Sequence, residues 1–226
     1  MCNYDRPGTV HVVPDPRPPY NRSTPVPQPT TTQNAVWDLH ALLEAAHVPG
    51  PYVLVGHSYG GLVARLYAHT YPAQVKGMVL VDSFSPELQD QMTAQEWKTW
   101  LVLNATPPAA IKEYPALEQL NFDVALEQVR ATRSIPPMPL VVLVADKSFG
   151  PLVERMAAEG KLPAGVPADF GYLISRAQLV AQAQVAKLVP GAKLVTKTHS
   201  GHDIMLDNPT LVTSSIVEVI KTVREG

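Results

Sequence analysis

The 226-residue sequence contains a single cysteine, Cys2, and carries a net charge of only −2. One cysteine excludes an internal disulfide framework and a cysteine-based metal cluster. The near-neutral charge gives no electrostatic reason to expect nucleic acid or a membrane surface as a partner. No apolar run reaches the length of a membrane span, and charges and prolines occupy residues 1–20, where a signal peptide needs an apolar stretch. The default prediction is therefore a cytoplasmic protein.

Metal and nucleotide sites also lack a signature. The seven histidines do not show ligand spacing, such as two histidines four residues apart on one helix with an acidic partner. No glycine-rich phosphate-binding loop is present. The sequence therefore predicts no metal and no cofactor.

Proline, by contrast, is abundant, with 23 residues in the chain, and eight of them fall between Pro7 and Pro29. Because proline fixes φ and donates no backbone hydrogen bond, this stretch is expected to be neither helix nor interior strand. Residues 1–29 are therefore predicted to form a proline-rich arm of loop and polyproline-like chain.

Beyond the arm, short apolar runs alternate with helical patterns. The runs are of the kind that is buried on both faces of a parallel sheet, and they occupy residues 52–55, 75–81, 140–145 and 192–196. Helical patterns begin near residues 30–32, 60, 172 and 210. This alternation predicts an α/β fold with a mostly parallel sheet and helices on both faces.

Residues 84–138 interrupt the alternation with helical patterns at 93–103, 109–120 and 123–132 and no convincing strand. An insertion between two sheet strands predicts a helical lid over the C-terminal edge of the sheet, with residues 1–83 and 139–226 as the core. Trp97, Trp100 and Leu101 are candidate pocket residues of this lid, although most such side chains pack in a small core of their own.

The strongest chemical signal is Gly56-His57-Ser58-Tyr59-Gly60, directly between a predicted buried strand and a predicted helix. So tight a turn forces strained backbone angles on the serine, and the flanking glycines avoid side-chain clashes. The turn exposes Ser58 Oγ and puts the Tyr59 N–H at a helix N-terminus, where it favours a developing oxyanion. Ser58 is therefore predicted to be a nucleophile and the Tyr59 N–H an oxyanion donor.

Residues 53–65 resemble the nucleophile elbow of α/β-hydrolase-fold esterases, and residues 78–82 and 200–204 match the same family's pattern. The resemblance extends over nearly the whole chain. It implies a serine, acid and histidine triad in that chain order, working through an acyl-enzyme. It also implies an N-terminally shortened α/β-hydrolase fold, without the first strands, the first helix and the usual oxyanion loop. The second oxyanion donor is thus unknown, and a backbone N–H between residues 7 and 20 is one alternative.

The resemblance points to His202 as the base, with His199 as its rival, while two aspartates compete for the acid. Asp82 ends the second predicted strand, a position that some family members use. Asp146 follows the third strand, but the usual acid position beyond that strand is a serine here; its simpler interpretation is a turn residue that accepts backbone N–H bonds. Asp82 is therefore preferred, with Asp146 as the alternative. His57 is expected to pack beneath the turn, pointing away from Ser58 Oγ.

These features predict a carboxylesterase-like serine hydrolase that cleaves small-molecule carboxylic esters of small to medium acyl groups. Amidase, lactonase or cofactor-free haloperoxidase activity on the same fold is an alternative. So is a catalytically weak or dead truncated form that acts as an interaction module. The strand at 52–55 would lack a neighbour, and because an unpaired apolar edge promotes association, we expect the arm or a second subunit in a homodimer to cover it.

Overall fold

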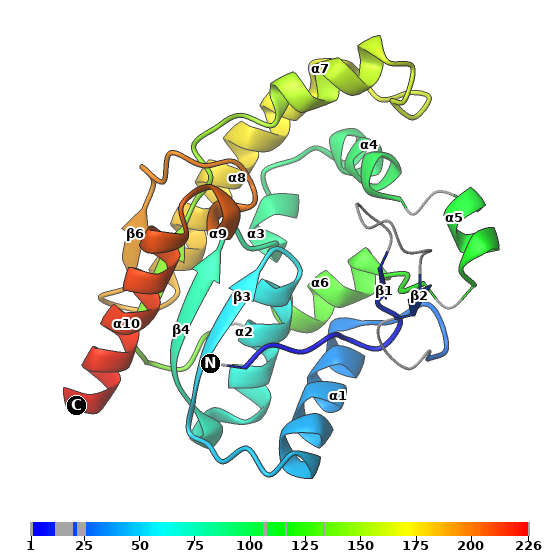
Figure 1. Ribbon diagram of the computed structural model, residues 1–226. Coiled ribbons are helices and arrows are strands. Elements are labelled where there is room, and N and C mark those ends of the chain that lie inside the picture. The colour runs from blue at the N-terminus through cyan, green and yellow to red at the C-terminus, as the bar shows by residue number, and fades with distance from the viewer. Residues whose placement is uncertain are drawn as a thin grey trace.

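The centre of the protein is a parallel four-stranded sheet (Figure 1). The computed structural model describes residues 2–11, 20–21, 26–105, 108–115, 117–132 and 134–225. The strands lie in the order β3 (Tyr52–His57), β4 (Val75–Val81), β5 (Leu140–Leu143) and β6 (Lys193–Val195). All four predicted strands and their parallel pairing are thus confirmed.

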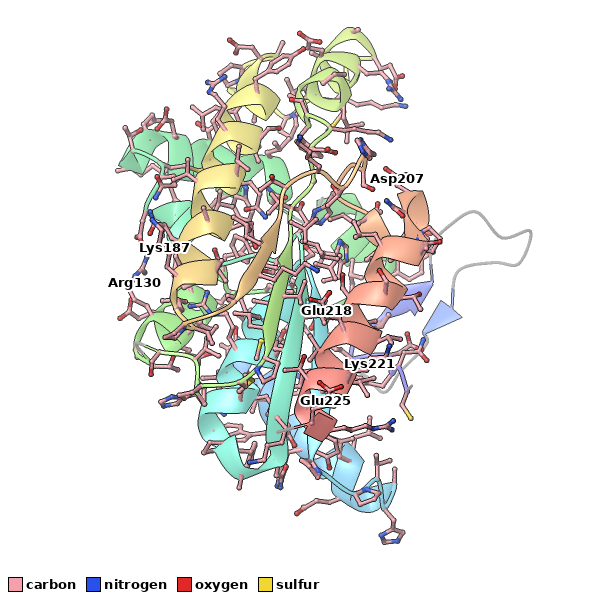
Figure 2. The ribbon with its side chains drawn as sticks, turned by 90° about the vertical axis from the view of Figure 1, so that its left-hand side faces the viewer. Arg130, Lys187, Asp207, Glu218, Lys221 and Glu225 are labelled. Atoms are coloured by element: carbon pink, nitrogen blue, oxygen red, sulfur yellow. The ribbon has the colours of Figure 1, made fainter. Side chains whose placement is uncertain are left out.

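Helices cover both faces of this sheet because alternate residues of the central strands are apolar on both sides. Met78 and Leu80 of β4 belong to one buried cluster, and Val79 and Val81 belong to another. The first cluster includes side chains of α1 (Thr32–Ala45), α2 (Gly60–Thr70), α6 (Phe122–Arg130) and α8 (Phe170–Lys187). The second includes side chains of α9 (Ile204–Asp207) and α10 (Pro209–Glu225). Figure 2 shows α8 and α10 on opposite sides of the sheet, which confirms the predicted layers.

Helix ends follow local capping chemistry. The Thr31 side chain accepts a hydrogen bond from the Asn34 N–H at the start of α1, and Thr93 does the same for Glu96 at the start of α4 (Ala94–Asn104). The pattern at 109–120 forms only α5 (Pro108–Glu113), because Pro115 restricts the residue before it. Among the described residues, four short helices were not predicted: η1 (Pro72–Gln74), α3 (Pro86–Gln89), α7 (Gly150–Ala158) and α9. None of the described helices combines the length and the apolar character needed to cross a membrane.

The helices between β4 and β5 differ in where they pack. Leu126 and Val129 of α6 are buried in the main core, and α6 contacts α1 and α2. In Figure 1, α4 lies beyond the ends of the strands and α5 lies apart from the sheet. Part of the 84–138 segment therefore belongs to the layer on the sheet, and its division from the core as a lid stays a prediction.

The proline-rich arm is described only in part, since residues 12–19 and 22–25 lie outside the described residues. Its two short strands, β1 (Val10–His11) and β2 (Tyr20–Asn21), pair with each other apart from the main sheet. Arg6 donates to Glu118 at 2.6 and 3.1 Å, which ties the arm to the segment before α6. β3 forms an edge of the sheet, and its Val55 is 42% exposed. Cover of this edge by the arm or by a second subunit stays a prediction.

Candidate active site

Ser58 occupies the turn between β3 and α2 with a φ of +51°, a left-handed conformation that side chains rarely adopt. Backbone hydrogen bonds hold it there. The Ser58 N–H donates to the Val81 oxygen at 3.2 Å, and the Ser58 oxygen accepts from the N–H groups of Gly61 at 2.9 Å and Phe84 at 2.8 Å. The strain is thus maintained by the next strand and by the first turn of α2, as in a functional turn.

Two glycines make this turn sterically feasible. A Cβ on Gly56 would lie 2.5 Å from the Gly60 oxygen, and a Cβ on Gly61 would lie 2.3 Å from the Cβ of Ser83. A Cβ on Gly60 would meet nothing within 4 Å. The close approach of strand and helix therefore requires glycine at 56 and 61, whereas Gly60, which the motif includes, has room for a side chain.

His202 and Asp82 are joined by a short hydrogen bond between Nδ1 of the imidazole and Oδ2 of the carboxylate, 2.7 Å apart. His202 lies in the loop between β6 and α9, and Asp82 directly follows β4, 120 residues earlier. The bond raises the pKa of His202 above its ordinary value, although partial burial opposes the shift. A carboxylate only accepts, so Nδ1 carries the proton and Nε2 of the neutral ring is left as the basic nitrogen.

The other oxygen of Asp82 is also fixed. Its Oδ1 accepts from the Ala145 N–H at 3.1 Å and from Nε2 of Gln178 at 3.3 Å. Asp82 is 4% exposed and has a φ of +38°, a second strained position at the end of a strand. A buried carboxylate needs such partners, and here they point Oδ2 at His202.

The rival residues have other partners. Asp146 Oδ1 accepts from the Ser200 N–H at 2.9 Å; burial opposes the shift, but backbone N–H groups hold the pKa of Asp146 below its usual value. The side chain of His199 is 83% exposed, with Nδ1 3.9 Å from Asp146. Asp146 thus shapes the loop that leads to His202, which agrees with its interpretation as a turn residue.

Of the predicted oxyanion donors, only one can be placed. The Tyr59 N–H opens α2 beside Ser58, and it donates to no backbone oxygen of the described residues. Burial raises the pKa of the Tyr59 phenol to about 12, and the Arg6 guanidinium lies 5.1 Å from the centre of the ring. Most of the loop at 7–20, the suggested source of a second donor, lies outside the described residues.

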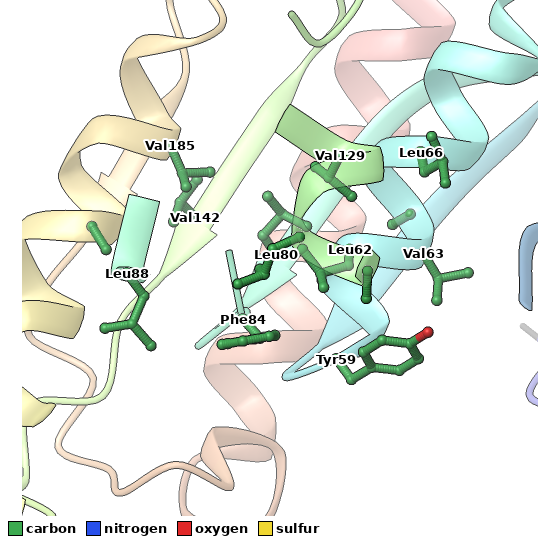
Figure 3. Close-up of a cluster of buried hydrophobic side chains, with 14 of the residues drawn as sticks. Tyr59, Leu62, Val63, Leu66, Leu80, Phe84, Leu88, Val129, Val142 and Val185 are labelled. Atoms are coloured by element: carbon green, nitrogen blue, oxygen red, sulfur yellow. The ribbon is translucent and has the colours of Figure 1, made fainter. Parts of the chain in front are cut away.

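Ser58, Asp82 and His202 line one cavity of about 550 Å³. Its wall is mainly apolar, and part of the wall is continuous with the core: Tyr59, Phe84 and Leu88 belong to both (Figure 3), and so does Trp100. The other apolar lining residues are Leu120, Phe122, Ala145, Phe149, Leu152 and Ile174. Polar side chains, among them Asn104, Lys147, Ser148, Ser175 and Gln178, complete the lining.

The three pocket residues proposed from the sequence differ in position. Trp100 lines the cavity and stacks on Phe84, with ring centres 4.9 Å apart. Trp97 stacks behind Trp100 at 4.7 Å and donates from Nε1 to Asp123 Oδ1, so it supports the wall without lining it. Leu101 is partly buried against the core and is not among the lining residues.

Two contacts at the site escaped sequence reasoning. Gln178, on α8, bonds both Asp82 and the Ser83 oxygen, and a glutamine in a helix gives no signal of such a role. His57 does not pack beneath the turn as expected; its Nε2 lies 3.0 Å from the backbone oxygen of His202.

Within the described ranges, no group of three or more His, Cys, Asp or Glu side chains is arranged to hold a metal ion.

Comparisons with known proteins agree with this fold. A family model described as the alpha/beta hydrolase fold matches residues 12–133. The carbendazim hydrolyzing esterase of Nocardioides sp. (strain SG-4G) is 27% identical over 192 residues, which cover 79% of this chain and 75% of that protein. The probable transporter efuK of Hormonema carpetanum is 23% identical over 226 residues, which cover 85% of this chain but 32% of that protein. The chain thus spans about a third of the length of this relative.

A solved structure extends the agreement to the whole fold. The alpha/beta superfamily hydrolase from Oenococcus oeni PSU-1 superimposes with a TM-score of 0.52 at 16% identity. The match covers 97% of this chain and 80% of that one. At this identity the similarity concerns the fold alone.

Proposed function

Because the chain belongs to the alpha/beta hydrolase fold family, we propose that it is a serine hydrolase that cleaves carboxylic esters of small to medium acyl groups. The observation that carries the proposal is the 2.7 Å bond between His202 and Asp82 beside a cavity that Ser58 also lines. A nucleophile on a strained turn, a base and a buried acid that orients the base are the parts of nucleophilic acyl transfer.

In the proposed acylation, Ser58 Oγ attacks the ester carbonyl carbon while Nε2 of His202 takes the Oγ proton. Asp82 stabilises the imidazolium that forms, and the Tyr59 N–H donates to the oxyanion. The tetrahedral intermediate then breaks its bond to the alkoxy oxygen, and His202 returns the proton to the leaving alcohol. The product of this half-reaction is an ester between the acyl group and Ser58.

Deacylation repeats the sequence with water. His202 takes a proton from water, the oxygen attacks the acyl carbon, and Ser58 leaves with the proton that His202 returns. The charge passes through the same oxyanion position, so one N–H serves both half-reactions. Loss of an oxyanion donor costs about a hundredfold to a thousandfold in other serine hydrolases, so a second donor would determine how demanding a substrate the site can cleave.

The cavity supports the choice of substrate. Its volume of about 550 Å³ is in the range of small-molecule sites, and its aromatic and aliphatic wall suits an apolar acyl or alcohol group. Trp100 and Phe84 are each 7% exposed and stacked, so they form a rigid wall. The name of the Nocardioides relative, an esterase, also favours ester cleavage.

The test is labelling with a fluorophosphonate probe and hydrolysis of p-nitrophenyl esters of increasing chain length. We expect labelling that Ser58→Ala abolishes, and kcat/KM that rises and then falls as the acyl chain exceeds the cavity. Trp100→Ala enlarges the cavity, so it should move the optimum to longer chains. Folded protein that the probe does not label would exclude this function and leave an interaction module as the better explanation.

A further inference from the structure

We propose that His57 is a positioning residue that ties the loop carrying His202 to the strand end carrying Ser58; this inference rests on the function proposed above for those two residues. Nε2 of His57 lies 3.0 Å from the backbone oxygen of His202. A carbonyl oxygen only accepts hydrogen bonds, so Nε2 of His57 carries a proton and donates. The residue before the nucleophile is thus bonded to the backbone of the base.

The bond from His57 connects this loop to β3, whereas the other hydrogen bonds that anchor the loop connect it to different elements. Asp146 accepts from the Ser200 N–H at 2.9 Å, and Asp207 accepts from the Gly201 N–H at 2.8 Å. These bonds hold the loop to the end of β5 and to α9. Among the hydrogen bonds between described residues, the one from His57 joins the His202 backbone to β3, whose end leads directly into Ser58.

The position of His202 therefore depends on two hydrogen bonds, one to its side chain and one to its backbone. Asp82 orients the imidazole through Nδ1 at 2.7 Å, and His57 fixes the backbone from which that imidazole extends. The rings of His57 and His202 are 4.5 Å apart and inclined by 45°, so His57 also fills the space beside the base. Because rates of acyl transfer depend on sub-ångström placement of base and nucleophile, a shift of the loop lowers the rate.

Burial lets His57 act as a neutral donor, although the carboxylates of Asp203 and Asp82 favour its charged form. Asp203 Oδ1 lies 3.8 Å from Nε2, the His202 ring lies beside it, and Asp82 lies behind His202. Burial lowers the pKa of His57 and the neighbouring His202 lowers it further, whereas Asp82 raises the pKa of His202. As the pH falls, His202 takes its proton first. His57 is then still uncharged, and it places no second positive charge beside the imidazolium of the proposed reaction.

The experiment compares His57→Leu, which removes the donor, with His57→Gln, which keeps an N–H at similar reach. His199→Asn is the matched control, because this exposed histidine lies on the same loop outside the site and asparagine tolerates its φ of +55°. We expect His57→Leu to lower both kcat and the rate of fluorophosphonate labelling by about tenfold, the effect of one lost hydrogen bond, with KM within about twofold. His57→Gln should recover most of the rate, and the control should match the parent protein. Equal kcat and labelling rates for folded His57→Leu and the parent would overturn the proposal.

A second measurement does not require a reactive site. In the Ser58→Ala background, proton NMR follows the His202 Nδ1 proton that Asp82 accepts. We expect His57→Leu, or His57→Phe if the leucine variant does not fold, to broaden or shift this resonance, and His57→Gln to restore it. An unchanged resonance in the donor-free variants refutes the positioning role. A parent protein that the probe never labels refutes the proposed function instead, so the two failures are distinguishable.

Discussion

Replacing Asp82 by asparagine changes one atom in a buried side chain, and the surrounding contacts dictate how the new amide turns. Oδ1 accepts from the Ala145 N–H at 3.1 Å and from Gln178 Nε2 at 3.3 Å. If the amide turned to put its NH₂ group there, that group would face two other hydrogen-bond donors, the Ala145 N–H and Gln178 Nε2. The amide oxygen therefore stays in place, and the NH₂ group faces Nδ1 of His202.

The consequence is the wrong tautomer of the base. With an N–H donor 2.7 Å from it, Nδ1 must become the acceptor, and the imidazole proton moves to Nε2. A protonated Nε2 cannot take the proton of Ser58, and no negative charge remains to stabilise the imidazolium. The equivalent change in a serine protease costs about 10⁴-fold in kcat, and we expect a loss of about that size in kcat for Asp82→Asn.

The assay is steady-state hydrolysis of p-nitrophenyl acetate, with circular dichroism to verify folding. Asp146→Asn is the matched control, because its Oδ1 can still accept from the Ser200 N–H at 2.9 Å. We expect the control to keep kcat within about threefold, because the bond from the Ser200 N–H is kept and Asp146 does not contact His202 in the proposed site. Folded Asp82→Asn with more than a tenth of the parent kcat would refute the reasoning, and a large loss for Asp146→Asn alone would move the acid role to that residue.

Four further outcomes follow from contacts described above. Activity requires neutral His202, whose pKa is raised above 6.5 by its bond to Asp82, so kcat/KM should rise with pH through a midpoint above 6.5. The same raised pKa stabilises the fold fully below pH 6.5, and denaturant titrations should show this contribution lost as pH rises through the folded-state pKa. Gly61→Ala, whose Cβ would lie 2.3 Å from a neighbouring Cβ, should lower the free energy of unfolding by about 1–3 kcal/mol, whereas Gly60→Ala, with open space, should not; equal denaturation midpoints would contradict this. Gln178→Met removes one donor to the buried Asp82 carboxylate and should reduce kcat by about tenfold, measured on p-nitrophenyl acetate; an unchanged kcat would show that the Ala145 N–H suffices.

The fold was predictable because its signals are local and repeated. The central strands contain continuous apolar runs, since a strand between two helical layers is apolar on both faces, and the run at residues 78–81 is visible without any partner. Proline and glycine then set the boundaries. The turn at Ser58 is local in the same way, because the constraints on Gly56 and Gly61 arise within a few residues of the serine and the adjoining strand. The prediction of α5 failed in length where Pro115 outweighed the helical period.

The surroundings of Ser58 were a different problem, because their partners are distant in sequence. Asp82 and Asp146 both follow sheet strands, and nothing local tells which carboxylate points at a loop 120 residues beyond Asp82. Gln178 reaches Asp82 from a helix, and Trp97 and Trp100 share one helix although one supports the cavity wall and the other lines it. The sequence by itself determined the parallel α/β sheet and the strained serine turn, because backbone sterics and burial period act between near neighbours. Only the tertiary structure decided which carboxylate meets His202 and that His57 binds its backbone, because those distances depend on how β3, β4 and the β6–α9 loop converge at one edge of the sheet.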